Sequence, residues 1–274
     1  MQALPFVFAL VIAIGLVPLV RSRLVEAGLE RENYRGRRLP VPIGVAIVPV
    51  ALIALIPITL LARLTTADVF PADLSLVIAF IPAVALLGFV DDVLAGSSRG
   101  FRGHAAAAMK GSFSTGLLKA LGTLGLALLV ASALPVSDGE FLLSAAVLVL
   151  ATNAFNLLDL RPGRAVKAFL LLALCLTVAT QIIQPLAALG LFIGPMLVCG
   201  WFDLREQAML GDAGSNVVGA MAGVLIVLTL DTSEQVVALV LLVIINLYGE
   251  FRSISNVIEK LPGLRHLDSL GRPS

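Results

Sequence analysis

Two adjacent carboxylates, Asp91 and Asp92, follow an uncharged run that extends from Leu74 to Val90. The run predicts a membrane helix, so both acids lie at its C-terminal end, where the helix dipole is negative. Neighbouring residues on a helix point about 100° apart, so one aspartate can hold a metal ion while the other faces a substrate. A bound cation explains both acids, and a solvated pair at a helix end is the alternative.

A second polar motif, NAFNLLD, places Asn153, Asn156 and Asp159 at intervals of three residues. On a helix this spacing brings all three side chains to one face. Because polar groups in a membrane are costly without partners, such a face indicates either a polar site or hydrogen bonds between helices. Asp159 fits a polar site better than it fits helix packing.

A third motif, MLGDAGSN, carries Asp212 at the predicted start of a helix. A carboxylate at this position also serves as an N-terminal cap, which is the alternative explanation for Asp212. The glycines on either side, Gly211 and Gly214, allow backbone to approach a ligand closely.

All three acidic motifs are predicted to lie at one depth on one side of the membrane. Hard oxygen ligands of this type suit Mg²⁺, or Mn²⁺ in its place. A carboxylate-held metal with basic neighbours is what a diphosphate substrate requires, although each base is also explained by the charge bias of membrane proteins. The nearby bases are Arg99, Arg102, Lys110 and Lys119. With two histidines and no C-x-x-C pair, the sequence offers no zinc site.

The elements that must position these residues are membrane helices. The 274-residue chain is 59% hydrophobic and only 14% charged, whereas a soluble domain carries about 25% charged residues. Its net charge of +1 gives no indication of nucleic-acid binding. We expect an all-α, polytopic helix bundle with nine spans, because about 20 apolar residues cross a bilayer. The expected spans are 2–20, 42–62, 73–90, 116–135, 139–157, 165–183, 186–202, 214–230 and 235–250.

The basic residues predict how these spans are oriented. Eighteen of the nineteen Lys and Arg residues fall on one side of the nine spans, and Arg63 falls on the other. Since basic loops stay inside, the N-terminus is expected outside and the C-terminus in the cytoplasm. We expect a single transmembrane domain, 1–250, followed by a cytoplasmic tail, 251–274. The spacing of apolar residues in the tail predicts an amphipathic surface helix that Pro262 divides in two.

Taken in order, the three motifs resemble those of the polyprenyl-phosphate N-acetylhexosamine-1-phosphate transferase family, which includes the phospho-N-acetylmuramoyl-pentapeptide transferase. GFVDD resembles its GF-x-DD, NAFNLLD its N-A-x-N-x-x-D-G, and MLGDAGSNVVG its M-G-D-x-G-S-x-x-x-G. The resemblance covers roughly residues 30 to 230. It implies a multi-pass protein of the bacterial plasma membrane that acts in cell-envelope (cell-wall) glycan synthesis.

The activity implied by the resemblance is transfer of a sugar-1-phosphate from a UDP-sugar to undecaprenyl phosphate, releasing UMP, with Mg²⁺. It implies metal ligands at Asp212 and Asp91 and catalytic carboxylates at Asp91, Asp92 and Asp159. It also implies substrate binding by Asn153, Asn156 and Gly211 of the motifs and by Lys110, which stands where the family often has a phosphate-contacting lysine. The nearby base Lys119 is expected to bind substrate as well. The expected partners are the UDP-sugar, the polyprenyl phosphate and the membrane, without nucleic acid; a homodimer remains open.

The chain departs from the family pattern in two places. Leu160 and Pro162 stand where the family has a glycine and a second aspartate, and the family's histidine-rich cytoplasmic motif is absent. These departures motivate an alternative, a non-catalytic homologue that binds lipid or serves as a scaffold subunit in envelope assembly. A transporter and an intramembrane aspartyl protease are further alternatives. The acids lie at span ends, which disfavours a transporter, and a protease leaves the aspartate pair unexplained.

Overall fold

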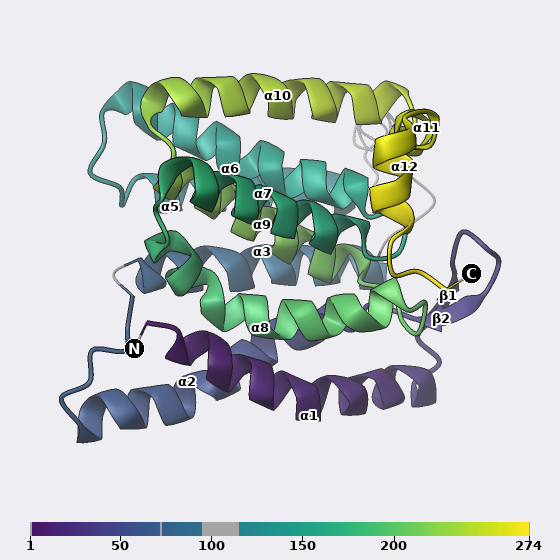
Figure 1. Cartoon of the computed structure of the whole chain (residues 1–274), viewed down its shortest axis with the longest axis horizontal. Helices are drawn as coiled ribbons and strands as arrows, with labels where there is room; N and C mark the ends of the chain where they lie inside the picture. The colour runs from purple at the N-terminus through teal and green to yellow at the C-terminus, as the bar shows by residue number, and fades with distance from the viewer. Residues whose placement is uncertain (1, 72, 95–114, 274) are drawn as a thin grey trace.

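The computed structural model describes residues 2–71, 73–94 and 115–273, and almost all of its regular structure is helical. Long helices run side by side along the horizontal axis of Figure 1. They are α1 (Leu4–Glu26), α2 (Ile47–Leu64), α3 (Leu74–Leu94), α5 (Thr115–Ala131), α6 (Asp138–Leu158), α7 (Arg164–Thr180), α8 (Gln184–Leu204), α9 (Gly211–Thr229) and α10 (Thr232–Phe251). A 3₁₀ turn, η1 (Ile43–Ala46), leads into α2. The expected all-helical bundle is confirmed.

Seven of the described helices are long and apolar enough to cross a membrane, which is typical of a multi-pass membrane protein. These seven are α1, η1 together with α2, α3, α6, α8, α9 and α10. Helix α5 is apolar but shorter, and α7 has 17 residues. A helix thus occupies each predicted interval, while the number of spans and their orientation stay predictions.

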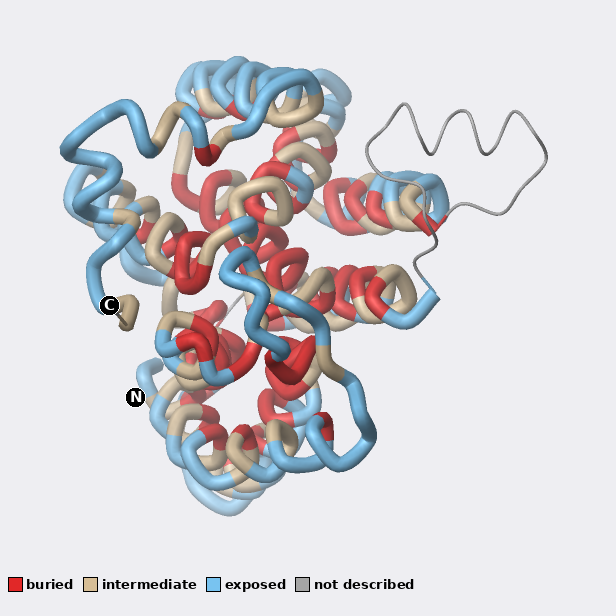
Figure 2. The backbone as a smooth tube through the Cα atoms, turned by 90° about the vertical axis from the view of Figure 1, so that its right-hand side faces the viewer, coloured by how far each residue is buried: buried red, intermediate tan, exposed pale blue. Residues whose placement is uncertain are grey.

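Helix α9 forms the centre of the bundle, and α10 lies at its edge. In the most apolar window of each helix, 78% of α9 is buried but only 11% of α10, and Figure 2 shows the buried backbone gathered in the middle of the molecule. Glycines allow α9 to approach its neighbours closely: a Cβ on Gly219 would lie 2.6 Å from the Cα of Thr152 on α6. Small residues at such crossings are a usual device of membrane helices.

A short antiparallel hairpin is the one described departure from helical structure. Strands β1 (Glu30–Glu32) and β2 (Arg38–Pro40) pair with Arg31 opposite Leu39. The all-α expectation missed this element because three-residue strands leave too short a pattern to recognise. Gly36, at φ 73°, provides the left-handed backbone that its turn requires. The hairpin connects α1 to η1 and lies beyond the helix ends (Figure 1).

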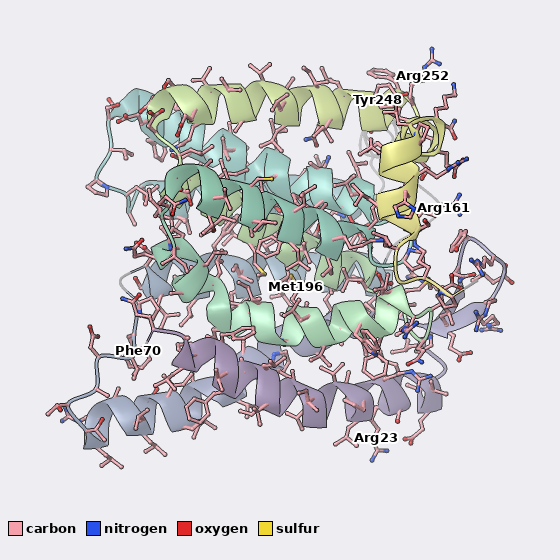
Figure 3. The ribbon with its side chains drawn as sticks, in the orientation of Figure 1. Arg23, Phe70, Arg161, Met196, Tyr248 and Arg252 are labelled. Carbon is pink, nitrogen blue, oxygen red and sulfur yellow. The ribbon has the colours of Figure 1, made fainter. Side chains whose placement is uncertain are left out.

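The tail forms two short helices, α11 (Ile254–Lys260) and α12 (Pro262–Ser269), so the predicted division at Pro262 is confirmed. Both lie at the same end of the bundle as the hairpin (Figure 1). We call this end the hairpin end. Arg23, Arg161 and Arg252 lie there, whereas Phe70 lies at the opposite end, as Figure 3 shows.

Candidate functional site

The centre of the candidate site is an ammonium group shared by two carboxylates. Lys119 Nζ lies 2.7 Å from Asp91 Oδ2 and 2.6 Å from Asp212 Oδ2. The three residues come from the last turn of α3, the first turns of α5 and the first turn of α9. Their side chains are mostly buried, 12% exposed for Asp91, 15% for Lys119 and 34% for Asp212. Two negative charges therefore face one positive charge in a partly desolvated place.

Asp92 points to a different partner from Asp91, as neighbours on a helix should. Its Oδ2 accepts a hydrogen bond of 2.8 Å from the backbone N–H of Ala213, in the first turn of α9. This carboxylate thus satisfies one of the unpaired N–H groups of that helix end. Arg31 of the hairpin donates to the backbone oxygen of Asp92 and lies 3.9 Å from its carboxylate. Asp92 consequently ties α3 to both α9 and the hairpin.

Asn156 joins the same cluster from the C-terminal part of α6. With its amide oxygen towards Lys119, it accepts a bond of 3.2 Å from Nζ, and its nitrogen donates to Ser215 Oγ at 2.8 Å and to Asp212 Oδ1 at 3.3 Å. The opposite amide orientation would set its oxygen against acceptors only, so this one is favoured. All three sequence motifs therefore contribute a side chain within hydrogen-bond distance of Lys119 or Asp212.

Two glycines allow the cluster to close. A Cβ on Gly88 of α3 would lie 2.4 Å from the backbone oxygen of Asp212. Gly211 has φ 75°, and a Cβ there would lie 2.4 Å from Pro42 Cβ and 3.0 Å from Asp92 Oδ2. Gly88 and Gly211 therefore set how closely α3, α9 and the segment before η1 approach one another. The sequence interpretation had instead assigned Gly211, with Gly214, to close approach of a ligand.

Asp159 follows α6 directly, as its C-cap. Desolvation and the carboxylates of Asp203, Asp212 and Asp92 raise the pKa of Asp159 well above its usual value, and Arg164 opposes the rise. Asp159 therefore lies within the electrostatic field of the cluster, and a proton is more readily held there than on an ordinary aspartate.

Two other predicted residues lie elsewhere. Asn153 is exposed and donates to Asn246 Oδ1 of α10 at 2.6 Å, and Asn246 in turn donates to the backbone oxygen of Leu150 at 3.0 Å. Asn153 thus makes the hydrogen bond between helices that was the alternative for this motif. Lys110 lies outside the described residues.

The sequence interpretation missed two buried acids that build the hairpin end. Asp203 accepts from the backbone N–H groups of Gly163 at 2.6 Å and Leu210 at 3.2 Å, which fixes the loops before α7 and α9. Glu206 accepts from Tyr34 Oη at 3.0 Å and pairs with Arg37 at 3.3 Å, which holds the hairpin turn. A signal was present: both acids lie around the C-terminus of a predicted span, the same unfavourable dipole position as Asp91.

The donor set of the cluster consists of two carboxylates that share one cation. Among the described residues, no group of three or more His, Cys, Asp and Glu side chains is arranged to hold a metal ion. Magnesium nevertheless commonly takes one or two carboxylates, with water and substrate phosphate completing its shell. Oxygens of Asp91 and Asp212 already converge on one cation, at 2.7 and 2.6 Å from Lys119 Nζ. The residues present therefore fit a two-carboxylate magnesium site.

Compared with models of known protein families and with curated proteins, the chain matches none. The geometry of the hairpin end is consequently what bears on function. This geometry defines a multi-pass helical membrane protein with a buried cluster that has more carboxylates than cations.

Proposed function

We propose that the chain is a magnesium-dependent sugar-1-phosphate transferase of the bacterial plasma membrane. It transfers the sugar-1-phosphate of a UDP-sugar, of N-acetylhexosamine type, to a polyprenyl phosphate at the cytoplasmic face and releases UMP. The observation that carries the proposal is the meeting of three motifs, distant in sequence, around Lys119. A purely structural set of helix caps would not need to share one buried cation.

The proposal includes nine spans with the N-terminus outside and the hairpin end in the cytoplasm. Two features support it. A helix occupies each of the nine predicted intervals, and the bases Arg23, Arg161 and Arg252 gather at the hairpin end (Figure 3). Positive charge marks the cytoplasmic side of membrane proteins, which is where a UDP-sugar is available.

In the proposed reaction, an oxygen of the polyprenyl phosphate attacks the β-phosphorus of the UDP-sugar. A new P–O bond forms, the bond from the β-phosphorus to the bridging oxygen breaks, and UMP leaves with that oxygen. A phosphate monoester has its second pKa near 6, so at neutral pH the nucleophile needs little help from a base. Positioning and charge neutralisation therefore provide most of the catalysis.

The residues divide these tasks. Asp91 and Asp212 would hold magnesium, which would neutralise diphosphate charge. Lys119, released from the carboxylates, would pair with a phosphate oxygen, and Asn156 would orient it by hydrogen bonding. Asp159, with its raised pKa, would hold a proton close to the leaving or attacking oxygen. Asp92 would position α9 through the bond to Ala213.

A direct assay tests the proposal. The purified full chain is incubated in detergent with undecaprenyl phosphate, Mg²⁺ and a panel of UDP-sugars, and UMP is measured. We expect UMP from at least one UDP-sugar and none after the magnesium is chelated. A matched control is Asp138→Asn, which removes an acid from the first turn of α6 at the opposite end and should retain full activity. Folded protein that releases no UMP from any sugar would refute the transferase.

One observation favours the second candidate, a non-catalytic subunit that binds lipid or serves as a scaffold. Lys119 already bridges Asp91 and Asp212, so the cluster is partly neutralised without a metal. A scaffold of this kind would bind polyprenyl phosphate in vesicles yet release no UMP, with or without Mg²⁺. The same preparation therefore distinguishes the two candidates.

A further inference from the structure

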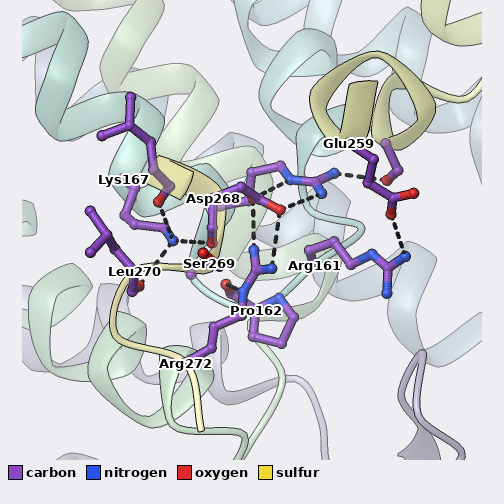
Figure 4. Close-up of polar contacts among 12 residues, drawn as sticks. Arg161, Pro162, Lys167, Glu259, Asp268, Ser269, Leu270 and Arg272 are labelled. Carbon is purple, nitrogen blue, oxygen red and sulfur yellow. Dashed lines mark hydrogen bonds and ion pairs between the residues drawn. The ribbon is translucent and has the colours of Figure 1, made fainter. Parts of the chain in front are cut away.

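The C-terminal segment docks onto the loop between α6 and α7 through a buried charge cluster. Asp268 of α12 binds Arg164 with both oxygens, at 2.8 and 3.0 Å, and Arg272 with both, at 2.7 and 3.0 Å. The side chains are only 5% exposed for Arg164, 11% for Asp268 and 10% for Arg272. Figure 4 shows Asp268 at the centre of these contacts, with Arg272 reaching Pro162.

Further contacts join the two segments on either side of Asp268. Arg272 Nε donates to the backbone oxygen of Pro162 at 2.8 Å, and Arg164 also donates to Ser255 Oγ of α11 at 2.9 Å. Lys167 Nζ donates to the carbonyls of Leu267 and Leu270 at 3.1 and 3.2 Å. A cation here complements the C-terminal end of α12, so donors from both segments, Arg164 and Lys167 of the body and Arg272 of the tail, join the tail to the body.

The docked loop is the one that carries Asp159. It begins at Asp159, the C-cap of α6, and ends at Gly163, whose N–H is held by Asp203 at 2.6 Å. The positive charge of Arg164 also lowers the pKa of Asp159, against the rise caused by burial and the neighbouring carboxylates. The tail therefore fixes both the path of this loop and the position of the Arg164 guanidinium.

We propose that residues 254–273 form a clamp that positions the α6–α7 loop, with Asp268 as the residue that closes it. Asp268 is a positioning residue: it holds Arg164 directly, and it holds Arg272, which in turn binds the carbonyl of Pro162. Two bidentate guanidinium pairs on one carboxylate fix direction as well as distance. The clamp is a property of the fold and does not depend on the proposed transferase activity. If that activity is present, the clamp positions the loop that begins at Asp159.

Hydrogen exchange of the full-length protein in detergent tests the clamp without any assay of activity. In Asp268→Asn, amides of residues 160–167 should exchange at least tenfold faster than in the wild type, while those of α9 keep their protection. Glu259→Gln is the matched control, because its pair with Arg161 is at 3.0 Å but Glu259 is 53% exposed. We expect exchange in the control within twofold of the wild type.

A milder variant covers the case in which Asp268→Asn does not fold. Ser255→Ala removes only the neutral bond to Arg164 and should accelerate exchange of the same loop about threefold. The clamp is refuted if the loop of a folded Asp268→Asn exchanges at the wild-type rate. If Asp268→Asn does not fold, a wild-type rate in Ser255→Ala refutes it instead.

If UMP release is found, Asp268→Asn should lower kcat more than it raises KM, and Asp268→Glu should restore part of kcat. Equal effects of Asp268→Asn and Glu259→Gln on kcat would overturn the positioning role. An absence of UMP release from the wild type would refute the transferase and leave the exchange experiment as the test of the clamp.

Discussion

Two charge clusters at the hairpin end divide their charges in opposite proportions. In the first, the single cation Lys119 lies between the carboxylates of Asp91 and Asp212. In the second, the single carboxylate of Asp268 lies between the guanidinium groups of Arg164 and Arg272. Each cluster joins segments that are far apart in the sequence, and each is largely buried.

The difference lies in what each cluster still lacks. Lys119 has three donors but one charge, so the first cluster keeps a negative excess that a further cation can satisfy. In the second cluster each guanidinium is matched in geometry by the carboxylate, and Arg164 has a further acceptor in Ser255. A cluster with a negative excess suits the binding of a further cation, and a carboxylate saturated by two bidentate guanidinium groups suits a structural joint.

The largest effect should come from breaking the complete cluster. Asp268→Asn leaves two buried guanidinium groups without their carboxylate, and loss of one member of a buried pair costs about 3–5 kcal/mol. We expect the thermal midpoint in detergent to fall by several degrees. A midpoint equal to that of the wild type would show that Arg164 and Arg272 find water or another partner instead.

A substitution in the first cluster should reduce activity strongly and stability little, the opposite of Asp268→Asn. Asp212→Asn should reduce UMP release at least about a hundredfold, the loss typical when a preorganised charge in a site is removed. Its free energy of unfolding should remain within about 1 kcal/mol of the wild-type value, because Lys119 keeps its pair with Asp91 and the negative excess is relieved. Unchanged UMP release would refute the metal assignment, and a large loss of stability would remove the contrast between the clusters.

Close backbone packing should matter more at Gly88, beside the first cluster, than at Gly125 of α5. Gly88→Ala places a Cβ 2.4 Å from the backbone oxygen of Asp212, and such overpacking costs about 1–3 kcal/mol. Gly125→Ala in α5 is the matched control, since a Cβ there would have no neighbouring side chain or helix within 4 Å among the described residues, and it should be neutral or slightly stabilising. Equal midpoints for the two variants would show that α3 and α9 are not held at this distance.

The pH dependence of the second cluster has a defined direction. Burial alone would raise the pKa of Asp268, but hydrogen bonds and charge from Arg164 and Arg272 lower it from 3.8 to about 2. Between about pH 2 and 3.8 the unfolded chain therefore binds more protons than the folded chain. The stabilisation that Asp268 provides is full above pH 3.8 and is lost as the pH falls towards 2. Thermal unfolding of the wild type and of Asp268→Asn is measured at pH values from 7 to about 2.5. The difference between their midpoints should be constant above about pH 5 and should shrink below about pH 4. A difference that shrinks already between pH 7 and 5 would contradict this.

The smallest effect is expected at the rim of the clamp. Glu259→Gln breaks an ion pair with Arg161 in which Glu259 is 53% exposed, and exposed pairs contribute about 0–1 kcal/mol. The thermal midpoint should fall by no more than a degree or two, and less in high salt. A loss as large as that of Asp268→Asn would place the joint at Arg161 instead.

Much of the fold follows from the sequence because apolar runs of about 20 residues have few alternatives to a membrane helix. The acids of the first two motifs, Asp91, Asp92 and Asp159, were also recognisable locally, since acids at the C-terminal ends of apolar runs conflict with the helix dipole. The hairpin was not predictable, because three residues per strand give no clear alternation. The sequence could not assign different roles to Asn153 and Asn156, because their spacing predicts one shared helix face. Only the position of α10 shows that Asn153 binds Asn246 instead of the cluster.

By itself the sequence determined the helices, the place of the charged motifs at helix ends and the break at Pro262, since each depends on residues close together along the chain. The tertiary structure decided which charges meet. Lys119 lies 93 residues before Asp212, and Asp268 lies 104 residues after Arg164. Hydrogen-bonded ion pairs act over about 3 Å, so their partners are chosen by helix packing, and here glycines such as Gly88 set how closely the helices approach.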